Sequence, residues 1–285
     1  MGEIDIRFNS WTEFVDAAEK MEGSLAVEER TSRRTGNASF SGTDSFEECI
    51  RLARCGWPEG AKRVKAKLDL LHAAIPAKRV VKEVQMSRVG PGIIDMGRYK
   101  QGHPAPWVTW QDTEVESNES PNGQIITIAF NITASGGVST DVMFRKGATI
   151  AALADILERS GKRVELILVD TSKGAHDKMI IRSLIKRAED PLDIDRITFA
   201  VANASTLRRL GFSIYENQKN AKWNGWWSGS GYGYCVNVEI PGAINVHSTD
   251  LRYFSDDASQ IAWLKQNLAE QGVEWDDENE KAMAN

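Results

Sequence analysis

The most chemically distinctive stretch of the chain runs from residue 219 to residue 234, where aromatic rings alternate with glycines and lysines. Single-stranded nucleic acid is bound by stacking bases on aromatic side chains, at about 1–3 kcal/mol per base, while cations follow the phosphates. Glycines let the backbone shape itself around such a strand. The candidate contacts in this aromatic segment are Lys219, Lys222, Trp223, Trp226, Trp227, Tyr232 and Tyr234. The alternative is an aromatic hairpin buried against a sheet, which the sequence allows equally for Trp226 or Trp227 taken singly.

A basic surface for the phosphates is predicted in the first third of the chain. Residues 30–100 hold 15 Lys and Arg against 7 Asp and Glu, although the whole chain has a formal charge of -5. Such asymmetry is typical of a surface that meets a polyanion, and the alternative is a solvated face of a folded protein. Candidate phosphate contacts are Arg33, Arg34, Arg51, Arg54, Lys62, Arg63, Lys65 and Lys67, which Arg208 and Arg209 could extend. Residues 250–285, by contrast, are acidic.

A second candidate site follows the apolar run at residues 124–132, where the chain reads Asn131-Ile-Thr133-Ala-Ser135-Gly-Gly. Ligands of open parallel sheets bind beyond the carboxyl ends of the strands. The loop resembles the metal-ion-dependent adhesion site of von Willebrand factor A domains, in which Asp-x-Ser-x-Ser follows the first strand, and the likeness extends over residues 124–271. A divalent cation needs at least one anionic oxygen. Because Asn131 stands in place of the family's Asp, we expect no bound metal and no other cofactor.

Signatures of catalysis are weak along the whole sequence. The chain has no GxxxxGK[ST] or GxGxxG motif to hold phosphates, and its four histidines are not spaced as metal ligands. Asp170, Ser172 and His176 could be imagined as a triad, but three such common residues near a strand end arise readily by chance. We therefore predict a non-enzymatic protein.

Hydrophobic periodicity and capping signals predict the elements that position these residues. Ser10 followed by Glu13 is a capping box that opens a helix. Helices are predicted at 8–20, 43–55, 61–74, 147–159, 177–188 and 259–271, and strands at 124–132, 163–170, 196–202, 236–240 and 243–247. From residue 124 onward, strands alternate with helices. This alternation predicts an α/β fold that is von Willebrand A-like, with a mainly parallel sheet flanked by helices and joined by right-handed crossovers.

The Gly- and Pro-rich stretch at residues 86–120 predicts a domain boundary or long loop. We expect a basic, mainly helical N-terminal portion at 1–120, an α/β sheet domain at 121–272, and an acidic, disordered tail at 273–285. Three cysteines leave one unpaired, which favours a reducing compartment. No apolar run approaches the roughly 18 residues of a membrane helix, and the first ten residues are unlike a secretory signal. We expect a cytoplasmic protein, located in the host cytoplasm if it is phage-encoded.

Three stretches of the chain resemble a small, uncharacterised family from phages and mobile elements. They are SWTEFVDAAE at 10–19, FSGTDSFEECIRLARCGWPEG at 40–60 and GATIAALADILERSGKRVEL at 147–166. The functional association that this resemblance suggests is with the single-stranded-DNA-binding RNA polymerase cofactor of podovirus-type phages. It implies binding of melted promoter DNA and recruitment of a phage RNA polymerase.

Two functions are therefore predicted. The first is non-enzymatic binding of single-stranded DNA through the basic surface and the aromatic segment. The alternative is a protein-interaction module, such as a virion or assembly component, that uses the degenerate adhesion-site loop at Asn131, Thr133 and Ser135. The sequence leaves open whether the chain forms homo-oligomers and whether RNA competes with DNA.

Overall fold

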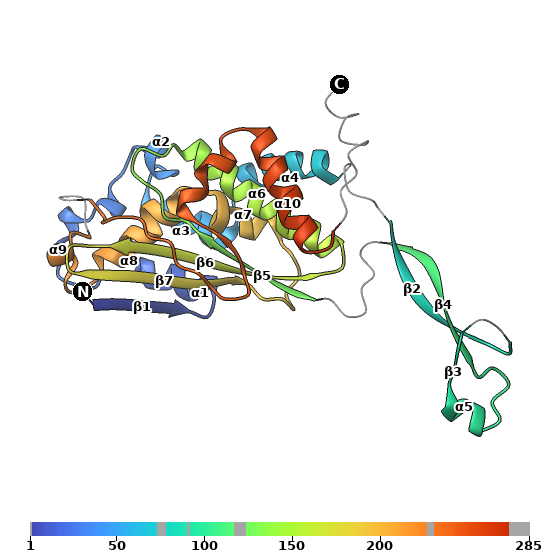
Figure 1. Ribbon diagram of the computed structural model, residues 1–285. Coiled ribbons are helices and arrows are strands. Elements are labelled where there is room, and N and C mark those ends of the chain that lie inside the picture. The colour runs from blue at the N-terminus through green and yellow to red at the C-terminus, as the bar shows by residue number, and fades with distance from the viewer. Residues whose placement is uncertain (1, 73–77, 90–91, 117–123, 227–230, 274–285) are drawn as a thin grey trace.

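In a computed structural model, the chain forms a five-stranded sheet with a layer of helices against it, and a second, smaller sheet apart from it (Figure 1). The structure describes residues 2–72, 78–89, 92–116, 124–226 and 231–273. The strand order of the large sheet is β1-β7-β6-β5-β8. Its strands are β1 (Gly2–Phe8), β5 (Ile125–Asn131), β6 (Arg163–Lys173), β7 (Asp177–Lys186) and β8 (Ile244–Val246).

Most neighbouring strands of the large sheet are parallel. β1 pairs with β7, and β5 pairs with both β6 and β8, in parallel register, whereas β6 and β7 are antiparallel. The helix α6 (Thr140–Arg159) connects β5 to β6. The prediction of an α/β protein with a mainly parallel sheet flanked by helices is confirmed.

The helix predicted at 177–188 is wrong, because these residues form the strand β7. Only residues 174–176 separate β7 from β6. A crossover to a parallel strand takes roughly a dozen residues or more, so a connection this short turns the chain back beside the strand it has just left. Met179, Ile180 and Ile181 are all buried in β7. A buried run of this kind does not show the alternation that marks a half-exposed strand.

The strand predicted at 196–202 is also wrong, because these residues belong to the helix α7 (Ile194–Ala202). Asp193 caps it, since its carboxylate accepts hydrogen bonds from the backbone N–H groups of Asp195 and Arg196. Every residue from Ile197 to Ala202 is buried, because α7 packs against α3, α4 and α6. A helix that is apolar on all sides reads like a buried strand in the sequence.

The remaining helices of the body lie near their predicted positions. As far as the described residues extend, the helices predicted at 8–20, 43–55, 61–74, 147–159 and 259–271 are confirmed, with shifted ends. The predicted cap at Ser10 is present, because its hydroxyl accepts from the N–H of Glu13 at 3.2 Å. They are α1 (Trp11–Glu19), α3 (Phe46–Cys55), α4 (Pro58–His72), α6 and α10 (Asp257–Glu270). Shorter helical segments are η1 (Val27–Glu29), η2 (Thr31–Arg33), α2 (Ala38–Ser41), η3 (Thr206–Gly211), α8 (Phe212–Glu216), α9 (Ala221–Asn224) and η4 (Ser248–Phe254). Residues 236–240, predicted as a strand, form none.

The domain division predicted at residue 120 does not match the structure. β1 joins the large sheet, and Phe14 and Phe46 share one hydrophobic core with Ile128 and Leu168. The intervening residues build a separate antiparallel sheet from β2 (Lys78–Ser87), β3 (Ile93–Ile94) and β4 (Trp107–Glu116), with the short helix α5 (Met96–Lys100) at its far end (Figure 1). This arm stands away from the body, where a boundary or loop was predicted. The predicted tail lies outside the described residues from 274 onward.

Among the described residues, no helix is long and apolar enough to cross a membrane.

Candidate functional site

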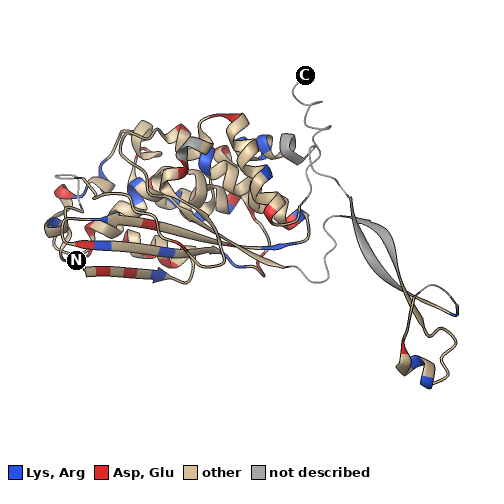
Figure 2. Cartoon of the chain, viewed as in Figure 1, with Lys and Arg blue, Asp and Glu red and all other residues tan. Residues whose placement is uncertain are grey.

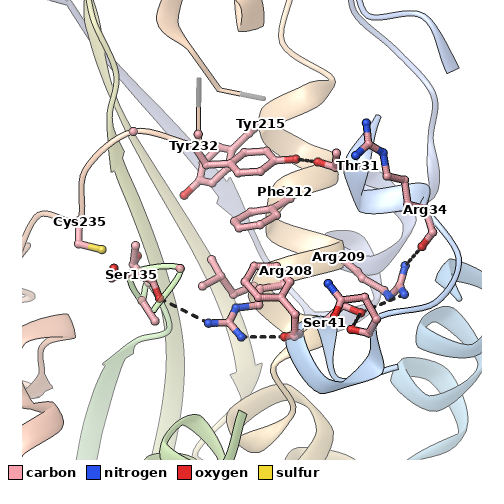
Figure 3. A pocket seen from close by; sticks show the side chains of 18 of the residues that line it. Thr31, Arg34, Ser41, Ser135, Arg208, Arg209, Phe212, Tyr215, Tyr232 and Cys235 are labelled. Carbon is pink, nitrogen blue, oxygen red and sulfur yellow. Dashed lines mark hydrogen bonds between the residues drawn. The ribbon is translucent and has the colours of Figure 1, made fainter. Parts of the chain in front are cut away.

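A cavity of about 700 Å³ opens at the carboxyl ends of β5 and β6 (Figure 3). Its walls come from residues 31–41, the 133–136 loop after β5, Thr171 in β6, and two stretches at 207–215 and 231–235. Chain segments that are far apart in the sequence thus meet at one edge of the sheet. None of the described residues that line the cavity is Asp or Glu, whereas Arg34, Arg208 and Arg209 all belong to it. Among the described residues, the ionisable groups that define the charge of the lining are therefore mainly arginines.

Aromatic rings form one wall of the cavity. The rings of Phe212 and Tyr232 are stacked, with centroids 3.6 Å apart and planes inclined by 11°, and Tyr215 lies 6.3 Å from Tyr232. The Tyr232 hydroxyl donates to the buried carboxylate of Glu216 at 2.6 Å and contacts the Thr31 hydroxyl. These bonds fix the ring, so the wall is preformed.

Two consecutive arginines of η3, a π-helical turn, lie against the cavity with their guanidinium groups buried. Arg208 donates to the carbonyls of Phe40 at 2.7 Å and Val138, and at 3.4 Å to that of Ser135. Its guanidinium also lies 4.1 Å over the Phe40 ring. Burial lowers the pKa of Arg208 to about 10, which leaves it charged at neutral pH. Within the described part of the chain, no carboxylate pairs with Arg208, and the groups that it contacts are neutral.

Arg209 connects the cavity wall to the 32–43 segment. Its guanidinium donates to the carbonyls of Ser32 at 3.0 Å, Arg34 at 2.9 Å and Thr43 at 2.7 Å, and to the Ser41 hydroxyl at 3.1 Å. The π-helical turn places Arg208 and Arg209 so that one reaches the 133–138 loop and the other reaches the N-terminal segment. Turns of this kind are found frequently at functional sites.

A buried carboxylate lies behind the cavity wall at Asp170. Its Oδ1 accepts hydrogen bonds from the Thr133 hydroxyl at 2.9 Å and the Tyr215 hydroxyl at 2.7 Å, while Oδ2 has no partner among the described residues. Burial raises the pKa of Asp170 to about 6, against the lowering effect of these hydrogen bonds. Asp170 is therefore mostly ionised at neutral pH and holds two lining residues, although it does not itself line the cavity.

Asp170→Asn is expected to reduce the pH dependence of stability between about pH 4 and 6. The folded-state pKa of about 6 exceeds the ordinary 3.8, so the stability that the protonated group contributes is present below the ordinary value and lost as the pH rises through about 6. A pKa difference of this size changes the free energy of unfolding by on the order of 3 kcal/mol. Asparagine retains the acceptor oxygen and carries no charge. Urea unfolding of the variant and the wild type over a pH series measures the effect, with Glu59→Gln, at an exposed position, as the control. Parallel stability curves for Asp170→Asn and the wild type would contradict it.

The loop that resembles an adhesion site does not fit a metal ion. The Asn131 Oδ1 accepts from the Thr133 backbone N–H at 2.9 Å, and its Nδ2 donates to the Val236 carbonyl at 3.1 Å. The Thr133 hydroxyl donates to Asp170, and Ser135 is exposed beside the cavity. No anionic oxygen of the loop is therefore free for a cation. Within the described ranges, no group of three or more His, Cys, Asp or Glu could hold one.

The structure separates the residues of the aromatic segment. Tyr232 and Tyr234 line the cavity, and Tyr234 is 79% exposed. Trp223 is 65% exposed and stacks on His176, with centroids 4.0 Å apart. The prediction that Trp226 stacks on bases is wrong, because its side chain is completely buried in the core. Trp227 lies outside the described residues.

Of the two lysines of that segment, Lys222 pairs with Glu29 at 2.7 Å. Lys219 is exposed, and within the described ranges no ion pair involves it. It is therefore the lysine of this segment that is available to a phosphate.

Four of the eight cations of the predicted basic surface form ion pairs with acidic side chains. Arg54 forms ion pairs with Asp16 and Glu19, and Arg63 forms one with Asp141. Lys65 pairs with Asp195, and Lys67 pairs with Asp257. Arg33 donates instead to the last carbonyls of α1. Figure 2 shows the resulting mixture of both charges over the helices. Arg51 and Lys62 are exposed without an ion pair among the described residues, but they lie outside the cavity lining. Of the predicted N-terminal cations, only Arg34 lines the cavity.

Sequence reasoning missed the aromatic wall residues Phe40, Phe212 and Tyr215. Nothing in their local sequence distinguishes them from core residues. The doublet Arg208-Arg209 within an otherwise apolar stretch was the available signal, because buried cations are rare unless they have partners or a function.

Comparison with other proteins places the chain in a family but supplies no function. No curated protein and no solved structure matches it. A family model described as a domain of unknown function, DUF7192, matches residues 2–274 and thus includes every residue of the cavity. The chain therefore belongs to the DUF7192 family.

Proposed function

We propose that the protein is a non-enzymatic single-stranded DNA-binding protein whose site is the carboxyl edge of the large sheet. The observation that carries this proposal is the cavity lining, which combines three arginines with aromatic rings and has no carboxylate among its described residues. Phosphates require cations and bases require aromatic surfaces, so this lining provides both kinds of contact. The site differs from the predicted basic surface on α3 and α4, where most of the predicted cations form ion pairs with carboxylates.

Exposed rings extend the site beyond the cavity. Tyr234 pairs through its backbone with Lys173, the last residue of β6, and Trp223 stacks on His176 in the turn that follows β6. Both rings therefore lie at the same end of β6 as the cavity. The exposed side chains of Arg34 and Lys219 supply positive charge there. A strand laid over this edge would meet two stacking surfaces and separate phosphate contacts.

Tyr234→Ala is expected to weaken binding of single-stranded DNA by about 1–3 kcal/mol, because one exposed stacking surface is lost.

Arg34→Ala is expected to weaken binding to all sequences and to reduce the slope of log K against log salt by about 1. Arg51→Ala removes the same charge from an exposed position outside the cavity, so it serves as the matched control. Fluorescence anisotropy of labelled single- and double-stranded oligonucleotides over a salt series measures these effects. Equal affinity for duplex and single strand, or equal effects of Arg34→Ala and Arg51→Ala, would contradict the proposal.

The 133–136 loop supports a second candidate, a protein-interaction module of von Willebrand A-like architecture. This loop connects β5 to α6 at the carboxyl edge of the sheet, where the resemblance places an adhesion site, and Arg208 holds it by its Ser135 and Val138 carbonyls. In this candidate, Thr133→Ala or Ser135→Ala abolishes capture of a protein partner and the chain has no affinity for DNA. The oligonucleotide titration therefore decides between the two.

The role as a phage transcription cofactor that recruits an RNA polymerase to melted promoters is the more specific form of the first proposal. It is supported by the resemblance of residues 10–19, 40–60 and 147–166. Co-purification with a phage RNA polymerase on a promoter containing a single-stranded bubble, and not on the closed duplex, tests it.

A further inference from the structure

The cavity changes in character from its rim to its floor. Arg34, Asn37, Ser135 and Tyr234 at the rim are exposed, whereas Thr171 and the other floor residues are buried. The buried floor residues are Thr133, Thr171, Leu207, Arg209 and Tyr215. The volume of about 700 Å³ lies within the roughly 300–1,000 Å³ of small-molecule sites. The site is therefore large enough to hold a group of small-molecule size.

The walls between rim and floor suit a flat ring with polar edges. The aromatic side chains of Phe40, Phe212 and Tyr232 supply apolar surface, and the side chains of Ser41 and Thr133 place hydroxyl groups nearby. Figure 3 shows Phe212 between Tyr232 on one side and Arg208 on the other. Flat, unstacked bases are recognised in pockets by this combination of aromatic contact and hydrogen bonding.

Arg208 has no carboxylate partner among the described residues. It is 3% exposed, it contacts backbone carbonyls and the Phe40 ring, and burial lowers its pKa. A buried charge without a counter-ion is unfavourable, and an anion nearby offsets that penalty. Arg34 adds a second, exposed guanidinium at the rim.

Building on the proposed function, we propose that the cavity holds one nucleotide of the strand. The base lies unstacked among the rings of Phe40, Phe212 and Tyr232, and the phosphate lies near Arg34 and Arg208. The inference follows from the joint presence of an aromatic wall and a buried guanidinium that has no carboxylate partner among the described residues. A free deoxynucleoside monophosphate then binds in the same place and competes with the strand.

Two neighbouring glycines provide a test that avoids damage to the fold. Gly136 lines the cavity, Gly137 does not, and a Cβ atom at either position would meet nothing within 4 Å. Gly136→Trp is expected to fill the cavity and weaken binding of dAMP about tenfold or more, whereas Gly137→Trp leaves it unchanged. Isothermal titration calorimetry with dAMP, deoxyadenosine and inorganic phosphate measures binding, and circular dichroism verifies that both variants are folded.

The outcomes separate this inference from the proposed function. Binding of dAMP that is stronger than that of deoxyadenosine or phosphate, and that is lost in Gly136→Trp alone, supports the nucleotide site. If single-stranded DNA binds but dAMP does not, or if Gly136→Trp leaves dAMP binding intact, the nucleotide site is overturned and the proposed function stands. If phosphate binds as well as dAMP, the cavity is an anion site without base recognition, which also overturns it. If neither single-stranded DNA nor dAMP binds, both proposals fail.

Discussion

Trp226→Ala is expected to lower the free energy of unfolding by about 3–5 kcal/mol, the usual range for removal of a buried large aromatic side chain. Its ring is completely buried and stacks at 6.3 Å on Tyr215, whose hydroxyl bonds to Asp170. Its indole N–H has no hydrogen-bond partner among the described residues, so the effect comes from lost packing and from the cavity left behind. Urea unfolding followed by circular dichroism measures it.

Trp223→Ala is the matched control for this substitution. The ring is 65% exposed, and among the described residues it stacks only on His176. Surface substitutions usually change stability by no more than about 0.5 kcal/mol, so this variant is expected to retain its stability and to lose affinity for single-stranded DNA. If Trp226→Ala were as stable as the wild type and bound DNA less well, Trp226 would not have the core role assigned to it.

The contrast between these two tryptophans shows what the sequence of the aromatic segment could not reveal. Both have lysine, asparagine or glycine close by in the chain, so local composition does not distinguish them. Trp226 is buried because it packs on Tyr215 and close to Gly174, where a Cβ would lie 2.8 Å from its indole nitrogen. Trp223, three residues earlier, faces outward from α9. Tertiary contacts decide between a core role and a binding role for such rings.

The parts of the fold that were predicted correctly are those with a long and unambiguous pattern. β5, α6 and β6 follow one another with an apolar strand, a capped helix and a second apolar strand. The errors at β7 and α7 involve short runs of consecutive buried residues, 179–181 in β7 and 197–202 in α7, for which helix and strand give the same pattern. β1 was missed, although Ile4, Ile6 and Phe8 alternate with charged residues and pack against the core. Its side-chain alternation was sufficient to suggest an edge strand.

The candidate site was only partly predictable, because local charge excess does not reveal ion pairing. Lys65 pairs with Asp195 at 2.9 Å and Lys67 with Asp257 at 3.2 Å, and these carboxylates lie far along the chain. The loop at Thr133 and Ser135 was correctly placed at the carboxyl edge of the sheet because that position follows from the strand order. The approach of Arg34 and Arg208 to that loop depends on how three distant segments pack.

Arg209→Met is expected to lower the free energy of unfolding by about 1–3 kcal/mol, because it leaves buried acceptors without their shared hydrogen-bond donor. Methionine has similar length but no donor, so the carbonyls of Ser32, Arg34 and Thr43 and the Ser41 hydroxyl lose their shared partner. The cost of leaving buried acceptors without a hydrogen bond exceeds the gain from burying an apolar side chain. Urea unfolding at neutral pH measures the loss.

Two further substitutions separate the roles of charge, hydrogen bonding and position at Arg209. Arg209→Lys keeps the charge but cannot span the same four acceptors, so it is expected to recover only part of the lost stability. Arg34→Met makes the same chemical change at an exposed rim position and is expected to alter stability by no more than about 0.5 kcal/mol. Full stability of Arg209→Met would show that the hydrogen bonds of Arg209 do not hold the 32–43 segment in place. Glu216, which accepts from the backbone N–H groups of Thr31 and Ser32, would then be the residue that holds this segment in place.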